Sequence, residues 1–360
     1  MTLKNIASDI GQRHDALALF SGGLDSILAV KVIQAQGLSV LALHFVSPFF
    51  GTPGKAGFWR REYGIEVRPV LLGQDYLRTV LLSPKRGYGK SLNPCVDCHT
   101  YMVRMAKSLM PSLGAKLIIS GEVLGQRPMS QRRDALHAVR KDSGADDVLL
   151  RPLSARVMEP SEVEKRGLVD RERLKGFSGR GRKAQMELAA EFGITTIPTP
   201  GGGCMLTEAE PSARYLKVMR AVGEPRPEDF ELCNQGRVYW AGEHMLTIGR
   251  NKADNERLRT MALDSDLLFD LRDFPSPVAI GRQFPGRPWP EEAVRDAAAF
   301  AASFSPKALR EAPGQQVVMA VTQGGTTREV SVLPSRETPL GWAEPRWEAV
   351  RDERHALAEP

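Results

Sequence analysis

The chain has 360 residues, of which 42% are hydrophobic and 26% are charged, and its formal net charge is +6. This is the composition of an ordinary globular protein with room for two domains or three. The N-terminus has no apolar core of signal-peptide length and no later stretch approaches about eighteen apolar residues, which excludes secreted and membrane-spanning chains. We therefore expect a cytoplasmic protein that has no membrane partner.

The first 200 residues alternate short apolar runs with helical patterns, which is typical of a parallel sheet with crossover helices. The expected strands are Ala16–Phe20, Ser39–Phe45, Ile65–Leu72, Lys116–Ser120 and Val148–Leu150. The expected helices are Asp25–Gln36, Phe58–Tyr63, Thr100–Met110, Ser130–Val139 and Arg182–Phe192. The pattern predicts an α/β fold.

A Pro/Gly cluster at residues 197–204 ends this alternation, and a second break follows at residues 224–227. We place the domain boundary there, with a first domain at 1–223, a small α+β domain at 224–335 and a tail at 336–360. The last fifteen or so residues, about the length of many frayed termini, are expected to be disordered. The α+β domain is expected to have strands at 238–240, 244–249, 267–271, 278–281, 316–321 and 328–333, and helices at 251–262 and 291–303.

A strand ending at Phe20 runs into the segment SGGLDS, residues 21–26, and then into a helix. The two glycines let the backbone approach a phosphate, the serines add hydroxyl donors, and the helix start adds its positive dipole end. The carboxylate of Asp25 would repel a bare phosphate, which indicates a bridging Mg²⁺. The structural alternative is a plain helix N-cap with a glycine turn.

SGGLDS resembles the signature loop of the PP-loop ATP pyrophosphatases, which have a five-stranded parallel α/β fold and cleave ATP to AMP and pyrophosphate. It is not a Walker loop, because no Gly-Lys-Ser/Thr follows. The resemblance implies that Asp25 helps to hold magnesium and that His44 and Phe45 lie near the adenine. The full set of expected ATP-binding residues is Ser21, Gly22, Gly23, Asp25, Ser26, His44, Phe45, Gly121 and Gln126.

The cysteines form a second pattern, since residues 93–98 read NPCVDC and Cys204 follows three glycines about a hundred residues later. A CxxC pair presents two thiolates from one turn, and a thiolate from a distant glycine loop can complete three corners of a metal or cluster site. The glycines at 201–203 would let the backbone approach a bulky cofactor. Zinc, with Cys233 or His99 as fourth ligand, and a pair of redox-active thiols without metal are the alternatives.

NPCVDC resembles the NPxxC motif of tRNA 2-thiouridine synthases, and the late third cysteine resembles the iron–sulfur-dependent tRNA thiolation enzymes. This implies that Cys95, Cys98 and Cys204 hold a [4Fe-4S] cluster whose open iron binds sulfide. It also implies that Cys98 and Cys204 act in catalysis together with Asp25. Cys233 lies beyond the expected boundary and is interpreted as a packing thiol.

The segment SGEVLGQRPMSQ, residues 120–131, follows the fourth expected strand. It resembles a stretch of the tRNA 4-thiouridine synthases, although Arg127 and Pro128 depart from their pattern. A loop at this end of a strand lies at the mouth of an open α/β sheet, where ligands bind. We expect its amides and hydroxyls to contact AMP or the target base.

Basic residues gather in two segments. Residues 171–183 hold six basic residues against one acidic, and a looser group spans residues 127–141. Both would attract a polyanion such as RNA, and a solvated surface is the alternative. The expected RNA contacts are Ser130, Gln131, Arg132, Arg180, Arg182, Lys183 and Arg250.

Residues 244–280, with IGRN at 248–251 and DLLFDLRD at 266–273, resemble the NFACT-R module of ribosome-quality-control proteins. The resemblance implies RNA binding, with Arg250, Arg259, Arg272 and Arg282 as candidates. Known 4-thiouridine synthases carry RNA-recognition domains ahead of the PP-loop, whereas twenty residues precede the loop here. We therefore expect the C-terminal domain to recognise tRNA.

Together these patterns predict ATP-dependent thiolation of a tRNA uridine, at C4 by resemblance, with sulfide or a persulfide carrier as sulfur donor. The alternatives are 2-thiouridine synthesis, a PP-loop enzyme that acts on a small molecule, and an RNA-binding or redox-sensing regulator. Whether the chain forms a homodimer is left open.

Overall fold

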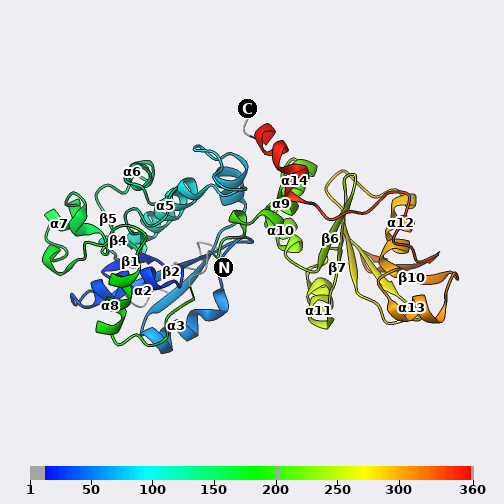
Figure 1. Cartoon of the computed structure of the whole chain (residues 1–360), viewed down its shortest axis with the longest axis horizontal. Helices are drawn as coiled ribbons and strands as arrows, with labels where there is room; N and C mark the ends of the chain where they lie inside the picture. The colour runs from blue at the N-terminus through cyan, green and yellow to red at the C-terminus, as the bar shows by residue number, and fades with distance from the viewer. Residues whose placement is uncertain (1–12, 200–202, 358–360) are drawn as a thin grey trace. The chain divides into compact units, whose positions relative to one another are not determined.

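The computed structural model describes residues 13–199 and 203–357, and it divides into two compact units, Met1–Thr207 and Glu208–Pro360 (Figure 1). The boundary expected after residue 223 is corrected to Thr207. The reason is that helix α9 (Ala209–Ala221) packs on α10 (Pro227–Cys233) and α14 (Trp347–Val350) of the second unit. The expectation of a separate tail at 336–360 is corrected as well, because α14 and the turn η6 (Arg351–Leu357) pack against α9.

The first unit is built on a five-stranded parallel sheet in the order β3-β2-β1-β4-β5. Its strands are β1 (Ala16–Leu19), β2 (Val40–Val46), β3 (Glu66–Leu71), β4 (Leu117–Ser120) and β5 (Leu149–Leu150). Strands β1, β2 and β4 are buried along almost their whole length, which explains their uninterrupted apolar runs. The expected α/β architecture and all five expected strands are confirmed.

Helices connect these strands. They are α2 (Leu24–Gln34), α3 (Ala56–Tyr63), α4 (Gln74–Tyr76), α5 (Cys95–Leu113), α6 (Arg133–Asp142), α7 (Glu162–Lys165) and α8 (Lys183–Glu191). Short 3₁₀ turns lie at Pro53–Lys55, Ala155–Val157, Arg171–Arg173 and Met205–Thr207, and a π-helix lies at Leu77–Leu82. Helix α2 contacts the sheet on one side and α8 on another, which is why its apolar residues show no single exposed face. None of the helices within the described residues combines the length and apolar character that a membrane crossing needs.

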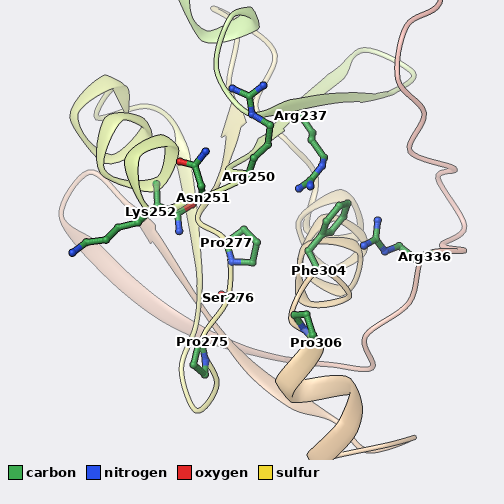
Figure 2. Close-up of a pocket in the computed structure, with 11 residues that line it drawn as sticks. Arg237, Arg250, Asn251, Lys252, Pro275, Ser276, Pro277, Phe304, Pro306 and Arg336 are labelled. Atoms are coloured by element: carbon green, nitrogen blue, oxygen red, sulfur yellow. The ribbon is translucent and has the colours of Figure 1, made fainter.

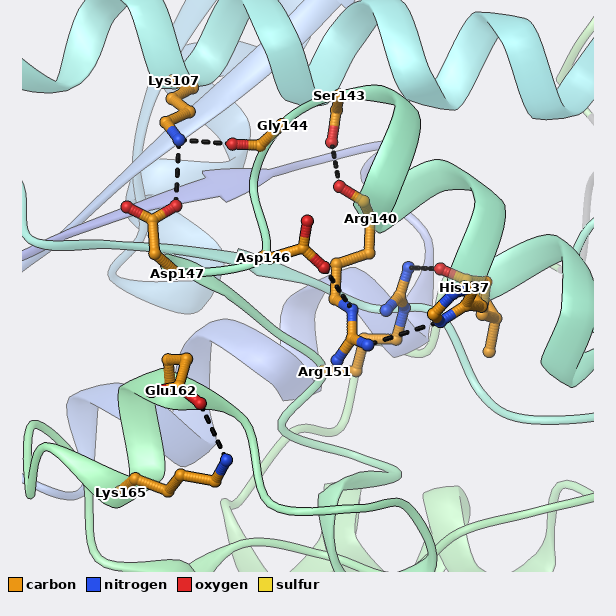
Figure 3. Close-up of polar contacts among 11 residues, drawn as sticks. Lys107, His137, Arg140, Ser143, Gly144, Asp146, Asp147, Arg151, Glu162 and Lys165 are labelled. Carbon is orange, nitrogen blue, oxygen red and sulfur yellow. Dashed lines mark hydrogen bonds and ion pairs between the residues drawn. The ribbon is translucent and has the colours of Figure 1, made fainter.

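Polar contacts fix the segment between α6 and β5 against α5 (Figure 3). Lys107 Nζ donates to Asp147 Oδ1 at 2.9 Å and also to the Gly144 carbonyl. Arg140 Nε lies 3.2 Å from Asp146 Oδ1 at the end of α6. These contacts precede β5, and Arg151 is the residue that follows this strand.

The second unit contains a six-stranded antiparallel sheet in the order β11-β10-β8-β9-β7-β6. Its strands are β6 (Arg237–Ala241), β7 (His244–Ile248), β8 (Leu267–Leu271), β9 (Ala279–Arg282), β10 (Val317–Gln323) and β11 (Thr326–Val332). Its helices include α11 (Lys252–Met261), α12 (Glu291–Ala302) and α13 (Pro306–Glu311), and α12 packs across the sheet. The expected α+β elements are present, and α10 and α13 are the helices that the sequence patterns missed.

Candidate functional site

The first unit has its ligand crevice where the strand order reverses. From β1 the chain crosses toward β2, and from β4 it crosses toward β5, so the connections leave these neighbouring strands in opposite directions. In open α/β sheets this switch point is where ligands bind, outside the carboxyl ends of the strands. Residues 21–26 follow β1 and are called the PP-loop below. Residues 121–131 follow β4 and are called the β4 loop.

The PP-loop has the backbone of an anion site. Gly22 has φ +80°, and a Cβ at this position would clash with the ring of Trp59. Ser26 Oγ donates to the Gly23 carbonyl at 2.7 Å, which holds the loop closed onto the start of α2. Gly23 is the N-cap of α2 and no side chain caps the helix. The N-cap alternative is therefore not supported, and the first-turn amides face the loop without a side-chain acceptor.

Asp25 has one partnered and one unpartnered oxygen. Gln126 Nε2 of the β4 loop donates to Asp25 Oδ2 at 3.2 Å, whereas Oδ1 is buried and accepts no hydrogen bond from the described residues. A buried carboxylate oxygen without a donor fits a cation ligand. Gly121 brings the β4 loop this close, because a Cβ there would lie 2.6 Å from the backbone nitrogen of Ser26.

His44 and Phe45 end strand β2 with side chains that are 2% and 4% exposed. His44 Nε2 accepts from the Thr52 amide at 2.8 Å, so Nδ1 carries the hydrogen and donates to the Phe20 carbonyl at 2.9 Å. Burial lowers the pKa of His44, which keeps the ring neutral. Both side chains belong to the core. The adenine contact at this strand end stays a prediction, and backbone atoms would have to make it.

The three cysteines of the predicted cluster lie in one neighbourhood. Cys95 is the first residue of α5 and Cys98 lies one turn later, at the start of the helix that precedes β4. Burial raises the pKa of Cys98, and the charges of Cys204 and Cys95 raise it further, so both residues act electrostatically on Cys98. Tyr76 Oη donates to Cys98 Sγ at 3.2 Å. All three residues are partly exposed, and no disulfide joins any of the four cysteines.

Backbone contacts hold the Cys204 segment in place. The Met205 amide donates to the Phe49 carbonyl at 2.9 Å, and the Leu92 amide donates to the Leu206 carbonyl at 3.1 Å. Gly203 has φ +58°, and a Cβ there would meet no atom within 4 Å. The other two glycines of the predicted cofactor approach, at 201 and 202, lie outside the described residues.

A single-ion site is not formed. Among residues 13–199 and 203–357, no three His, Cys, Asp or Glu side chains converge closely enough to hold one metal ion. Cys233 is fully buried on α10 of the second unit, where burial raises its pKa to about 12, as expected for a packing thiol. His99 Nδ1 is engaged with a carboxylate of the β4 loop. The zinc alternative therefore has no support in the described side chains.

Glu122 of the β4 loop contacts α5, the helix that begins at Cys95 and is called the cysteine helix below. This carboxylate is 6% exposed and accepts from Arg151 Nε at 2.9 Å, from His99 Nδ1 at 2.7 Å and from Ser120 Oγ at 2.8 Å. Burial alone would raise the pKa of Glu122, but the Arg151 guanidinium and the hydrogen bond from His99 hold it well below its usual range. The sequence patterns offered no signal for Arg151, which is 29 residues away.

The predicted RNA contacts of the first unit divide into two groups. Ser130 and Gln131 are 4% and 6% exposed, and the Gln131 carbonyl accepts from the Gly125 amide at 2.7 Å. They shape the β4 loop, and their contact with the substrate stays a prediction. Three others are exposed or half-buried, namely Arg180, Arg182 and Lys183. Their segment lies near the β4 loop, because the Gly179 amide donates to the Leu124 carbonyl at 2.7 Å. Arg132 is exposed and lies 3.3 Å from Asp134.

The four candidate arginines of the second unit differ in their partners. Arg282 is 0% exposed and pairs with Asp229 at 2.6 Å and Asp266 at 3.0 Å, so it stabilises the core. Arg259 forms a two-pronged pair with Asp270 at 2.5 and 2.6 Å, and Arg272 pairs with Glu329. The assignment of Arg282 as an RNA contact is corrected, whereas Arg259 and Arg272 remain candidates for RNA contact or ordinary surface residues. Arg250 lines an open pocket.

Comparisons with known proteins agree with the site of the first unit. Residues 11–159 match the family model described as thiamine biosynthesis protein (ThiI). The chain is 28% identical over 148 residues to a probable tRNA sulfurtransferase of Thermococcus kodakarensis, covering 40% of this chain and 38% of that one. It is 29% identical over 151 residues to one of Staphylococcus aureus strain Newman, covering 40% and 35%. The chain thus spans less than two fifths of the length of these relatives.

Two solved structures show only a distant likeness. One is the C-terminal part of a fibronectin/fibrinogen-binding protein from Streptococcus suis, with a TM-score of 0.24 and 14% identity over 51% of this chain and 79% of that chain. The other is a predicted tRNA methyltransferase subunit from Methanocaldococcus jannaschii, with a TM-score of 0.31 and 15% identity over 49% and 76%. Neither informs the fold. In its sheet order, its PP-loop and the match at residues 11–159, the first unit is similar to a ThiI-type PP-loop domain.

Proposed function

We propose that the chain is an ATP-dependent tRNA sulfurtransferase that replaces a uridine carbonyl oxygen, at C4 by resemblance, with sulfur. The observation that carries the proposal is the β4 loop, which contacts Asp25 of the PP-loop through Gln126 and the cysteine helix through Glu122. One loop thus borders an ATP-binding half and a sulfur-handling half. The names of the relatives matched over this domain point to the same activity.

The first step activates the oxygen. The PP-loop amides and the first turn of α2 bind the pyrophosphate of ATP, and Asp25 Oδ1 would hold Mg²⁺, which neutralises charge on the leaving pyrophosphate. The uracil carbonyl oxygen attacks the α-phosphate as the N3 proton is lost to solvent. A bond from oxygen to the α-phosphorus forms, and the bond to pyrophosphate breaks.

The second step replaces the oxygen. The sulfur of a hydrosulfide donor forms a bond to the activated carbon, the carbon–oxygen bond to AMP breaks, and the sulfur proton is released to give the thiocarbonyl. AMP leaves readily because its negative charge remains within the donor-lined crevice. A protein persulfide can also supply the sulfur. Its outer sulfur bonds to the activated carbon as AMP leaves, and a second thiol then attacks the inner sulfur, which forms a disulfide and releases the thiocarbonyl.

We propose a [4Fe-4S] cluster as the group held by Cys95, Cys98 and Cys204. When bound, it supplies an open iron for sulfide. Three thiolates can each bind a different iron of such a cluster, and the charges of Cys204 and Cys95 both act on Cys98. Tyr76 Oη donates to Cys98 Sγ and so favours the thiolate that ligation requires.

The test of this proposal is a thiolation assay in which anaerobically purified protein is supplied with ATP, sulfide and unmodified tRNA. We expect one pyrophosphate and one AMP for each 4-thiouridine detected by nucleoside mass spectrometry. A 2-thiouridine product would move the reaction to the other carbonyl. Pyrophosphate exchange into ATP that needs a metabolite and no tRNA, with no thionucleoside formed, would contradict the proposal and favour a small-molecule enzyme.

A second test addresses the cofactor alone. Reconstitution with iron and sulfide should give a brown protein whose absorption is lost in Cys204→Ser and kept in Cys233→Ala. Stoichiometric zinc binding with no cluster absorption would contradict the cluster while leaving ATP-dependent thiolation open.

A further inference from the structure

The second unit contains an open pocket of about 530 Å³ (Figure 2). Its walls come from the start of β6, the turn between β7 and α11, the Pro275–Pro277 turn, the junction of α12 and α13, and the segment after β11. Segments far apart in the sequence thus meet around one cavity. Its volume lies within the range of sites that hold small organic ligands or single nucleotides.

The charges that line this pocket all have one sign. Arg237, Arg250, Lys252 and Arg336 line it, and no acidic side chain does. Lys252 extends away from the centre in Figure 2 and lies 3.8 Å from Glu256, so the cations that converge on the Phe304 ring are Arg237 and Arg336. Arg250 is balanced by Asp254 at 2.7 Å. Within the described part of the chain, no ion pair is formed by Arg237 or Arg336.

The two arginines without carboxylate partners are held by an aromatic ring instead. Arg336 Cζ lies 3.3 Å from the centroid of the Phe304 ring, and Arg237 Cζ lies 5.7 Å from it. Figure 2 shows both guanidinium groups near this ring and beside the cavity. A guanidinium that packs against a ring face keeps its N–H donors directed outward at its edge. These donors suit the forked contact that arginine makes with a phosphate.

The rest of this unit makes the pocket distinctive. Arg259, Arg272 and Arg282 are all paired with carboxylates, so their charge is neutralised locally. Arg237 and Arg336, by contrast, line one cavity and form no ion pair among the described residues. A polyanion would gain most by binding there, because it would not have to displace a carboxylate.

We propose that this pocket binds the sugar–phosphate backbone of a single-stranded RNA segment, with the guanidinium groups of Arg237 and Arg336 on its phosphates. Single-stranded RNA fits better than a duplex because a cavity of this volume accepts one or two nucleotides, and because guanidinium and aromatic planes stack on exposed base faces. The identity of the RNA as the tRNA substrate rests on the proposed function, whereas RNA binding by the pocket does not.

The test is fluorescence anisotropy with the full chain and a labelled single-stranded oligonucleotide, a duplex of the same sequence, and unmodified tRNA. We expect the Arg237→Ala/Arg336→Ala protein to bind the single strand roughly a hundredfold more weakly. The slope of log affinity against log salt should fall by about 0.7 for each phosphate that an arginine no longer neutralises. The matched control is Arg295→Ala, since Arg295 is exposed, pairs with Glu291 on its own helix and does not line the pocket.

Unchanged affinity of the double variant would overturn the proposal, as would duplex binding that equals single-strand binding. Competition by AMP or inorganic phosphate at concentrations well below those of the salt series would reassign the pocket to a free phosphate compound. The two proposals fail separately. A protein that binds RNA through these arginines but never thiolates tRNA contradicts only the proposed function, and a double variant that thiolates tRNA normally with unchanged KM contradicts only the assignment of the tRNA substrate to this pocket.

Discussion

The candidate site of the first unit and the basic pocket of the second handle charge in opposite ways. Glu122 is buried, accepts three hydrogen bonds and is matched by Arg151 in the same core. Arg237 and Arg336 stand beside an open cavity and pack on an aromatic ring. A fixed, internally matched network suits bond-making, which needs groups held in one geometry. Exposed cations suit a flexible polyanion, so the comparison separates chemistry from recognition.

The comparison is tested most strongly at Asp25, where the first site leaves one buried oxygen without a donor. Asp25→Asn should lower tRNA-dependent pyrophosphate release by roughly 10³-fold, because the charge that would hold Mg²⁺ is lost. RNA affinity should not change. The control is Asp147→Asn, which removes an exposed carboxylate paired with Lys107. Full pyrophosphate release by Asp25→Asn would remove the magnesium role.

Glu122→Gln tests whether the first site depends on internal matching. The variant leaves the Arg151 guanidinium buried without a counter-charge, so we expect a loss of about 3 to 5 kcal/mol in the free energy of unfolding at pH 7. The measurement is urea unfolding followed by circular dichroism. Glu164→Gln, which breaks a pair with the half-exposed Arg171, is the matched control and should cost less.

The same variant has a pH signature. The folded-state pKa of Glu122 lies below its usual 4.5, so its stabilisation is present above that value and is lost as the pH falls through the folded-state pKa. The stability gap between wild type and Glu122→Gln should therefore shrink below about pH 4.5 and stay constant between about pH 6 and 8, the range where the unfolded carboxyl is ionised. A gap independent of pH would show that packing, rather than charge, accounts for the effect.

Tyr76→Phe should have the smallest effect. It removes the hydroxyl that donates to Cys98 Sγ, and a single hydrogen bond of this kind contributes about 1 kcal/mol. Because that hydrogen bond lowers the pKa of Cys98, its removal should raise the pKa further and slow cluster assembly near neutral pH. The time course of cluster absorption during reconstitution measures this, and an unchanged rate would separate Tyr76 from the thiol.

The sequence predicted the parts of the molecule that depend on local pattern. The five parallel strands, SGGLDS and the grouping of Cys95 with Cys98 all follow from apolar runs or short motifs. The contacts that join these parts were not predictable, since Glu122–Arg151 and Gln126–Asp25 link residues 29 and 101 positions apart. The Phe304–Arg336 stack likewise needs the folded sheet to bring its members together.

For a related reason, the positions of the arginines in the sequence did not show which of them can meet a ligand. Arg282 was equivalent to Arg250 in the sequence, but it is fully buried and pairs with Asp229 and Asp266. The resemblance implied that His44 lies near the adenine; this stays a prediction, and its ring is held between two backbone groups. Pairing across the fold, rather than residue type, decides which of these side chains can meet a ligand.

The most direct test of the account is a single-turnover experiment on Cys98→Ser, with pyrophosphate and thionucleoside measured in the same sample. If the β4 loop borders two chemically separate halves, this variant should release pyrophosphate from ATP in the presence of tRNA at nearly the wild-type rate and form no thiouridine. Asp25→Asn should lose both products. Formation of thiouridine by Cys98→Ser at the wild-type rate would contradict the account.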